Sequence, residues 1–141
     1  MPVTHAALVV LVVEDEVLLR CGVTDCLREA GYSVVETPSG EEAIAFCKSN
    51  MLIDIVFTDI SLIGSATGWD VGECYRAGRP DVSLIYTSGK SIDPERRVAG
   101  STFIPKPYQY NEVVDVCQRL HTKSPLRGRC LPFWGMLPAK G

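Results

Sequence analysis

Four short apolar stretches of this chain each end at a polar residue that can take part in chemistry, and this arrangement constrains the fold more than any other feature. The stretches are residues 8–13, 53–58, 83–86 and 103–105, and they are followed by Glu14 and Asp15, by Asp59, by Thr87 and by Lys106. The first stretch is continuously apolar, which favours a strand buried on both faces of a parallel sheet. Because parallel strands end at the same edge, these polar side chains are predicted to meet where open α/β sheets bind ligands.

Helical patterns separate the apolar stretches, with apolar residues at spacings of three and four. The predicted helices are residues 19–30, 40–47, 69–77 and 109–120, and a further strand is predicted at residues 32–37. Strands and helices that alternate with short links indicate βαβ units with right-handed crossovers. Five such units make an α/β fold, a three-layer sandwich.

Two positions within this pattern carry separate expectations. Residues 91–100 are the weakest element, since Asp93-Pro94 can begin a helix but little apolar periodicity follows. Gly22 lies inside a predicted helix, where glycine costs about 1 kcal/mol relative to alanine. This glycine therefore indicates close packing against a neighbouring element.

The length and composition are typical of one soluble domain. A chain of 141 residues predicts a single domain, and 46% hydrophobic with 22% charged residues is ordinary for a globular protein. No apolar run approaches the ~20 residues that span a bilayer, and no export signal is evident, so we expect a cytoplasmic protein that does not contact a membrane. The folded domain is expected at residues 1–121. A basic tail at residues 122–141, containing Pro and Gly, is expected to carry no output domain.

Charge and cysteine spacing argue against two other classes of function. All 17 acidic residues lie within residues 1–121, and such an acidic domain argues against nucleic acid as a partner. The six cysteines form no C-x-x-C pair and neither histidine has ligand spacing, which argues against a zinc site. Cys26, Cys47, Cys74 and Cys117 fall on predicted apolar helix faces, so they are interpreted as small buried hydrophobic residues.

Glu14, Asp15 and Asp59 would repel one another at a shared sheet edge, and at least one of them would have a raised pKa. A divalent cation removes this conflict. Mg²⁺, or Mn²⁺ in its place, takes oxygen ligands such as carboxylates, a backbone carbonyl and a phosphate oxygen. The three acids therefore predict a metal site.

Asp59 is the candidate nucleophile of this site. A carboxylate can attack phosphorus and form an acyl phosphate, and the oxygens of the transferring group need their charge neutralised. The cation would cover one oxygen, the Lys106 ammonium a second and the Thr87 hydroxyl a third. Each residue alone has an ordinary explanation as a turn, a helix cap or a solvated side chain. Four strand ends that bring these residue types to one edge favour the functional interpretation.

Four motifs stand at the ends of the predicted strands. They are VVEDE at residues 12–16, FTD at 57–59, YTSG at 86–89 and FIPKPY at 103–108. In order and spacing the chain resembles, over about residues 7–121, a stand-alone, single-domain receiver of bacterial two-component response regulators. This resemblance implies a flavodoxin-like sheet of five parallel strands in the order 2-1-3-4-5.

The resemblance implies that Asp59 receives a phosphoryl group from a histidine kinase or a histidine phosphotransfer protein. Asp15 would bind Mg²⁺ directly, Glu14 would assist through water, and the backbone carbonyl of Ser61 would complete the ligands from the protein. Beyond phosphorylating itself from a phosphodonor and slowly losing the phosphoryl group, the protein is expected to have no enzymatic activity.

The resemblance also implies a two-state switch. Thr87 is expected to move toward a phosphoryl group paired with Lys106, while Phe103 turns inward and alters a protein-binding face near the fourth and fifth helices of the family. The Lys106–Pro107 peptide bond is expected to be cis. Output is expected through protein contacts of a monomer or weak dimer, with a downstream target that the sequence does not identify.

Three features depart from the family pattern. Leu62-Ile63 stand where the family usually has Met-Pro, and Thr67 stands where it usually has Asp or Asn. The interval before Phe103 is short, which predicts a truncated fourth helix. The first change concerns the loop after the phosphoacceptor, and the last concerns the usual output surface.

Three other interpretations share part of this pattern. A degenerate receiver would act as a phosphorylation-independent binding module; Thr87, Lys106 and the acids argue against it, whereas Ile63 and the thin fourth helix leave it open. A small phosphatase of the haloacid-dehalogenase type has its Asp nucleophile after the first strand, but Asp59 follows the third. A flavodoxin-like FMN carrier needs a hydroxyl- or glycine-rich loop after the first strand, where this chain has three acids.

Overall fold

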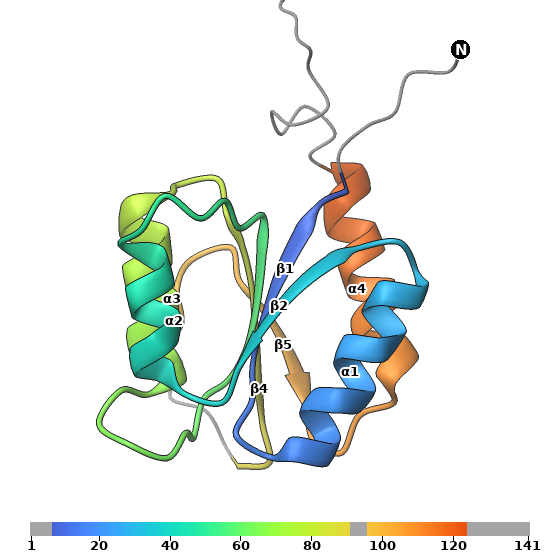
Figure 1. Ribbon diagram of the computed structural model, residues 1–141, viewed down its shortest axis with the longest axis horizontal. Helices are drawn as coiled ribbons and strands as arrows, with labels where there is room; N and C mark the ends of the chain where they lie inside the picture. The colour runs from blue at the N-terminus through green and yellow to red at the C-terminus, as the bar shows by residue number, and fades with distance from the viewer. Residues whose placement is uncertain (1–6, 91–95, 124–141) are drawn as a thin grey trace, which may run out of the picture.

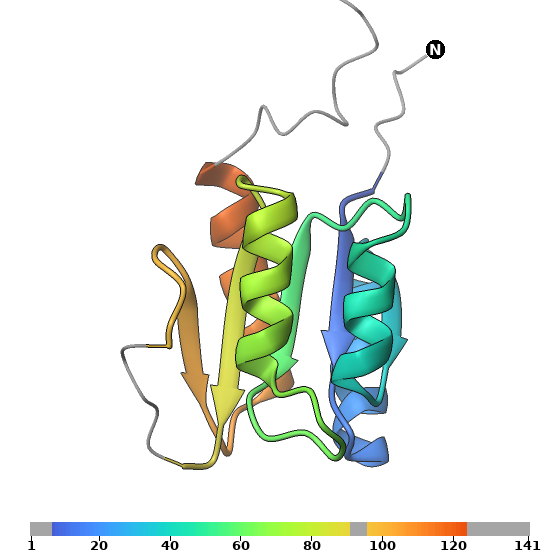
Figure 2. The same cartoon turned by 90° about the vertical axis from the view of Figure 1, so that its left-hand side faces the viewer.

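The computed structural model describes residues 7–90 and 96–123, which form one parallel sheet with helices on both faces (Figures 1 and 2). Its five strands lie in the order β2-β1-β3-β4-β5, so the predicted flavodoxin-like, three-layer α/β fold is confirmed. In chain order the elements are β1 (Val9–Val13), α1 (Val17–Glu29), β2 (Ser33–Thr37), α2 (Gly40–Cys47), β3 (Ile55–Asp59), α3 (Gly68–Gly78), β4 (Ser83–Ser88), β5 (Thr102–Pro105) and α4 (Tyr110–Lys123). Helices α1 and α4 cover one face of the sheet, and α2 and α3 cover the other (Figure 1).

The position of β1 explains why its sequence is apolar throughout. Val10 and Val12 pack into the core on the α1–α4 side of the sheet, whereas Leu11 and Val13 pack into the core on the α2–α3 side. All four side chains are fully buried, and complete burial of an aliphatic side chain stabilises a fold by about 1.5–3 kcal/mol. A strand between two helical layers has no solvent face, so it needs no alternation of polar and apolar residues.

Gly22 lies in the middle of α1 because the ring of Tyr110, at the start of α4, occupies the space beside it. A Cβ atom at this glycine would overlap the Tyr110 ring. The predicted close packing is therefore confirmed. Helix α4 begins at Tyr110 rather than Gln109, and the Tyr110 side chain is 37% exposed.

No helix forms between β4 and β5 within the part of the chain that the structure describes. Residues 91–95 lie outside that part, and residues 96–100 contain turns and a bend. Their sequence, RRVAG, offers one large apolar side chain, which is too few for a buried helix face. The helix predicted weakly at residues 91–100 is therefore not found in the described half of that stretch.

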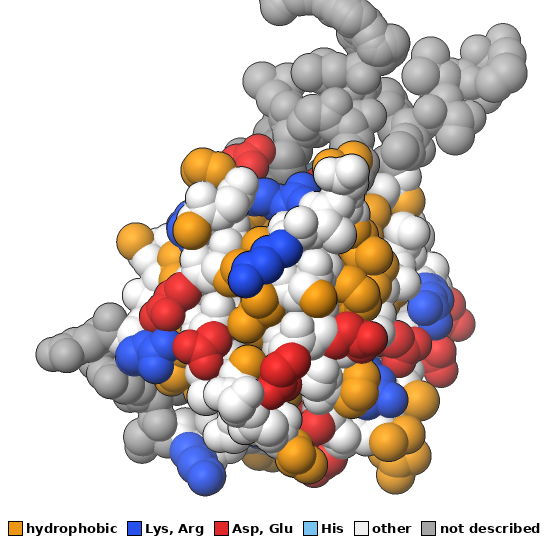
Figure 3. Space-filling view, turned by 60° about the vertical axis from the view of Figure 1, so that its left-hand side comes forward, with side chains coloured by type: hydrophobic (Ala, Val, Ile, Leu, Met, Phe, Trp, Pro, Cys, Tyr) orange, Lys and Arg blue, Asp and Glu red, His pale blue; other side chains and the backbone are white. Residues whose placement is uncertain are grey.

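Side chains hold this segment against α3 in place of helix packing. Arg76 of α3 donates to the carbonyl oxygen of Ala99 at 2.7 Å. Arg96 pairs with Asp70 and Glu73 of α3 at 3.3 and 3.0 Å. Figure 3, turned toward the α2–α3 side of the molecule, shows acidic and basic side chains interspersed on this surface.

An aromatic cluster fills the space between α3 and the last two strands. The ring centroids of Trp69 and Tyr86 lie 4.9 Å apart, and Ile60 completes the buried group. Val98 and Phe103 pack against it from residues 96–101 and from β5. Phe103, the predicted switch residue, is thus half-buried beside an aromatic surface.

The cysteines of the described residues are free thiols. Cys117 is fully buried in α4, and burial raises the pKa of its thiol to about 12. Cys26, Cys47 and Cys74 are half-buried. The interpretation as buried hydrophobic residues is therefore confirmed for Cys117 and holds in part for the other three.

Most of the expected basic tail lies beyond the residues that the structure describes. Of residues 122–141, those from 124 onward lie outside the described residues. Among the helices that are described, none combines the length and the apolar character needed to cross a bilayer.

Candidate functional site

The sheet brings the predicted site residues to one edge. Asp59 and Thr87 are direct neighbours in the register of β3 and β4. Glu14 and Asp15 follow the last residue of β1, and Lys106 follows the last residue of β5. All five side chains therefore emerge from the same edge of the sheet, as the order of the motifs predicted.

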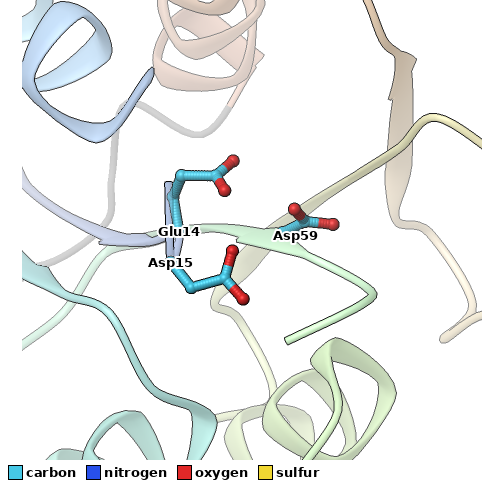
Figure 4. A group of neighbouring side chains, drawn as sticks. All are labelled: Glu14, Asp15 and Asp59. Atoms are coloured by element: carbon cyan, nitrogen blue, oxygen red, sulfur yellow. The ribbon is translucent and has the colours of Figure 1, made fainter. Parts of the chain in front are cut away.

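Three carboxylates form a tight cluster at this edge. One oxygen from each of Glu14, Asp15 and Asp59 lies within 4.8 Å of the other two, and Figure 4 shows the side chains extending in the same direction from the ends of β1 and β3. Glu14 and Asp59 are buried, and Asp15 is half-buried. Within residues 7–90 and 96–123, this is the one group of three acidic, His or Cys side chains placed closely enough to hold a metal ion.

Glu14 is the most deeply buried acid of the cluster. Burial, together with the charge of Asp59, raises the pKa of its carboxyl to about 7, although the Glu16 backbone N–H and the Lys106 ammonium oppose the shift. Its Oε1 atom is buried and accepts no well-formed hydrogen bond, with Lys106 Nζ 3.2 Å away. A hard cation beside this oxygen would satisfy it, so the donor set fits a divalent ion such as Mg²⁺.

Lys106 reaches into the cluster from the end of β5. Its Nζ atom donates a hydrogen bond to Asp59 Oδ2 at 2.6 Å. Burial alone would lower the pKa of this ammonium, but Asp59 and Glu14 raise it overall, so the group stays charged. The Lys106–Pro107 peptide bond is cis, as expected.

Thr87 carries a buried hydroxyl without a partner. The residue has no solvent exposure, and its Oγ1 atom makes no hydrogen bond. A buried polar group left unpaired costs about 1–3 kcal/mol, and each such group in a native fold calls for an explanation. Thr87 pairs with Asp59 in the register of β3 and β4, so its unpaired hydroxyl belongs to the strand position next to the candidate nucleophile.

The loop that follows Asp59 is tied to the acids by its backbone. The Ser61 N–H donates to Asp59 Oδ1 at 3.1 Å, and the Ile63 N–H donates to Asp15 Oδ2 at 2.9 Å. The Ile63 side chain is 79% exposed. The structure thus places Ser61 beside Asp59, while the role of its carbonyl as a metal ligand stays a prediction.

Two supports of this loop were not predicted. Thr67 and Asp70 form a capping box at the start of α3, in which each accepts a hydrogen bond from the backbone N–H of the other. Glu41 of α2 accepts hydrogen bonds from Ser65 and Ala66. The T-x-x-D spacing was a readable signal for the first support, whereas no sequence pattern indicates the second.

A cavity of about 420 Å³ is lined by Leu19, Gly89, Lys106, Pro107 and Tyr108. The Tyr108 ring stands edge-on to Phe57, with centroids 5.7 Å apart. Burial and the charges of Glu14 and Asp59 raise the pKa of the Tyr108 hydroxyl, which therefore stays protonated. Lys106 lines this cavity and also contacts Asp59, so it connects the cavity to the acid cluster.

Comparison with known sequences points to one family. The chain matches the family model described as response regulator receiver domain over residues 10–118. Over 119 residues it is 30% identical to the sensor kinase CckA of Brucella abortus (strain 2308), an alignment that covers 81% of this chain and 12% of the kinase. The chain spans about half the length of the other curated relatives that it matches.

Solved structures agree with this match. A response regulator receiver protein from Sinorhizobium medicae WSM419 superposes with a TM-score of 0.79 and 29% identity, covering 82% of this chain and 95% of that one. The receiver domain of the sensor histidine kinase PA1611 from Pseudomonas aeruginosa PAO1 was solved with a magnesium ion coordinated in its active site cleft. It superposes with a TM-score of 0.70 and 23% identity, covering 82% of this chain and 98% of that one, which shows a shared fold.

Proposed function

The chain belongs to the response-regulator receiver family, and we propose that Asp59 accepts a phosphoryl group from a histidine kinase or a histidine phosphotransfer protein. The observation that carries this proposal is the immediate surroundings of Asp59. A charged Lys106 ammonium lies 2.6 Å from its carboxylate, and the neighbouring strand presents the buried, unpaired hydroxyl of Thr87. Both groups are the donors that a phosphoryl group on Asp59 requires.

The proposed chemistry is a displacement at phosphorus. A carboxylate oxygen of Asp59 forms the new O–P bond while the N–P bond to the donor's imidazole breaks, and the leaving imidazole takes a proton from solvent. The Lys106 ammonium exchanges its bond to Asp59 for one to a phosphoryl oxygen, and Thr87 donates to another. Slow attack by water on the acyl phosphate regenerates the Asp59 carboxylate and releases inorganic phosphate, and no other enzymatic turnover is proposed.

Glu14, Asp15 and Asp59 would hold Mg²⁺ or Mn²⁺, together with the Ser61 carbonyl and water. Bound there, the ion supplies positive charge to a phosphoryl oxygen. The spacing of the three carboxylates and the burial of Glu14 and Asp59 support this assignment. The magnesium ion in the cleft of the PA1611 receiver domain is an example from a protein of the same fold.

The proposed switch uses two residues on the last two strands. Phosphorylation gives the Thr87 hydroxyl the acceptor that it lacks and draws it toward Asp59. Phe103, paired with Tyr86 in the sheet and half-buried against the aromatic cluster, then turns further inward. The face that changes is made by residues 96–101, β5 and α4, with residues 96–101 in the place of the family's fourth helix. We propose that a downstream protein binds this face and that the regulator is a cytoplasmic monomer or weak dimer.

The test is phosphorylation by a small phosphodonor. After incubation with acetyl phosphate and Mg²⁺, intact-protein mass spectrometry is expected to show the mass of one added phosphoryl group, stable to acid and labile to alkali. Asp59→Asn and treatment with EDTA should each abolish the gain, because they remove the nucleophile and the cation. Asp25→Asn, at an exposed position of α1, is the matched control and should be labelled like the wild type.

Other outcomes would support the alternative functions. Absence of labelling at any Mg²⁺ concentration would favour a degenerate receiver that binds partners without phosphorylation. Hydrolysis of many phosphate esters would favour a small phosphatase with an Asp nucleophile.

A further inference from the structure

The loop between Asp59 and α3 has no rigid residue at the place where the family usually has proline. Leu62-Ile63 occupy that place, and Gly64 follows with a φ of 112°. Glycine adopts this conformation freely and does not restrict the chain. The shape of the loop therefore depends on the hydrogen bonds that hold it.

Glu41, in the first turn of α2, holds the second half of this loop. Its Oε2 atom accepts hydrogen bonds from the Ser65 backbone N–H at 2.7 Å, from the Ser65 hydroxyl at 2.8 Å and from the Ala66 N–H at 3.2 Å. These bonds, with that of the Ser65 hydroxyl foremost, lower the pKa of the Glu41 carboxyl to about 2. Glu41 is therefore charged at neutral pH and bonds as a carboxylate.

Glycines allow α2 and the loop to approach each other this closely. A Cβ atom at Gly64 would lie 2.8 Å from Glu41 Oε2, and a Cβ atom at Gly40 would lie 2.8 Å from the carbonyl oxygen of Ala66. Both distances are too short for a side chain. The glycines and the carboxylate thus form one interlocking contact between α2 and the loop.

We propose that Glu41 is a positioning residue for phosphoryl transfer, because it keeps the loop closed over the acid cluster. The first half of the same loop bonds to Asp15 through the Ile63 N–H and to Asp59 through the Ser61 N–H. These two acids are oriented by a loop that Glu41 anchors. The inference rests on the proposed function, and it gives a role in that function to a residue that lies outside the acid cluster.

The contacts of Glu41 distinguish its proposed role at the loop from capping or packing of helix α2. The N-cap of that helix is Ser39, whose side chain accepts a hydrogen bond from the Glu42 N–H. Glu41 is exposed and belongs to neither hydrophobic core. Its removal therefore leaves the helix cap and the core intact, and the effect is expected at the loop.

The experiment measures the binding of Mg²⁺ alone to the full chain by isothermal titration calorimetry. Glu41→Ala is expected to weaken Mg²⁺ binding about tenfold, the lower end of what partners that orient metal ligands contribute. Glu41→Gln should weaken it less, because its amide oxygen still accepts from the same donors without the charge. Glu29→Ala removes an exposed acid at the end of α1 and should bind Mg²⁺ like the wild type.

Hydrogen exchange in the metal-free protein tests the loop directly. In Glu41→Ala the amide protons of Ile63 and Ser65 should exchange faster, while Leu11 in the centre of the sheet keeps its protection. Ser65→Ala, which removes one of the three hydrogen bonds, should shift both measurements in the same direction by less. Wild-type Mg²⁺ affinity and wild-type exchange in both variants would overturn the positioning role, as would a loss of protection spread evenly over the fold.

Labelling by acetyl phosphate in the same samples separates this inference from the proposed function. Glu41→Ala should be labelled slowly at low Mg²⁺ and at nearly the wild-type rate when Mg²⁺ saturates. If the wild type is not labelled but Glu41→Ala still loses Mg²⁺ affinity and loop protection, the phosphoacceptor function fails and the anchoring of the loop stands. If Glu41→Ala is labelled as fast as the wild type at low Mg²⁺, the positioning role fails and the phosphoacceptor function stands. A wild type that binds no Mg²⁺ would overturn both.

Discussion

Thr87 and Lys106 approach Asp59 from different strands, and they differ in whether their polar groups already have partners. The Lys106 ammonium contacts two carboxylates, whereas the Thr87 hydroxyl is buried with no partner. Nearby, the hydroxyl of Thr58 is also buried but donates to the Asp59 carbonyl oxygen at 2.8 Å. Thr87 is thus among several buried hydroxyls of the described residues that have no partner, and it lies where the proposed reaction needs a donor.

Replacing that hydroxyl by a methyl group should stabilise the unphosphorylated protein. Thr87→Val is expected to raise the free energy of unfolding by about 1 kcal/mol, because it removes an unpaired buried donor and preserves the shape. Thr58→Val is the matched control and should lower the free energy of unfolding by about 1 kcal/mol, since it removes a hydroxyl that is bonded. Urea denaturation measures both values. Equal destabilisation by the two substitutions would contradict an unpaired hydroxyl at Thr87.

A side chain would have much less room at the first residue of helix α3 than at its last. A Cβ atom at Gly68 would overlap the carbonyl oxygen of Asp59, whereas the nearest atom to a Cβ at Gly78 is Cys47 Sγ, at 3.7 Å. The Gly68 N–H also donates to the Ile60 carbonyl at 2.8 Å. The start of the helix is thus packed directly against the backbone of Asp59 and Ile60.

Two alanine substitutions in α3 should therefore differ in their effects. Gly68→Ala is expected to lower the free energy of unfolding by about 1–3 kcal/mol, because the backbone atoms that it meets cannot move aside cheaply. It should also slow labelling of Asp59 by acetyl phosphate. Gly78→Ala should change stability by less than about 1 kcal/mol, in the direction of the higher helix propensity of alanine. Denaturant unfolding measures the free energy of unfolding of both variants. Equal values would contradict the close approach at Gly68.

For the fold as a whole, the parallel sheet and the position of the site were predictable from short patterns, whereas the strand order was implied by the family resemblance. The continuous apolar run of β1 and the polar residues after the strands were enough to predict a covered parallel sheet and the edge at which the acids meet. Contacts between side chains far apart in sequence were not predictable. Gly22 signalled close packing but not its partner Tyr110, and nothing in the sequence linked Glu41 to Ser65. Hydrophobic periodicity records which face of an element is buried, but it does not record which polar groups meet across a loop.

The stability of the whole molecule should depend on pH through Glu14. Its pKa in the folded protein, about 7, lies above the ordinary value of 4.5, so between these values the folded state holds a proton that the unfolded chain has lost. The contribution of this group is therefore complete below pH 4.5 and is lost as the pH rises through 7, a fall of about 1–3 kcal/mol in the metal-free protein.

Urea unfolding between pH 5 and 8 in EDTA measures this fall. Glu14→Gln should flatten the profile, because the amide does not titrate. Mg²⁺ should restore stability chiefly at the upper end of the range, since it binds the deprotonated carboxylates of the folded state. A metal-free profile that rises with pH would contradict the raised pKa.

The surface beside β5 is held in place by polar side-chain contacts, unlike the helices that pack on the sheet through apolar side chains. Residues 96–101 are secured to α3 by Arg76 and Arg96 rather than by a buried apolar stripe. Single substitutions at these arginines can therefore reshape that surface while the apolar layers stay unchanged. Under the proposed function, recognition of a partner at this surface can therefore change through residues other than the three clustered acids.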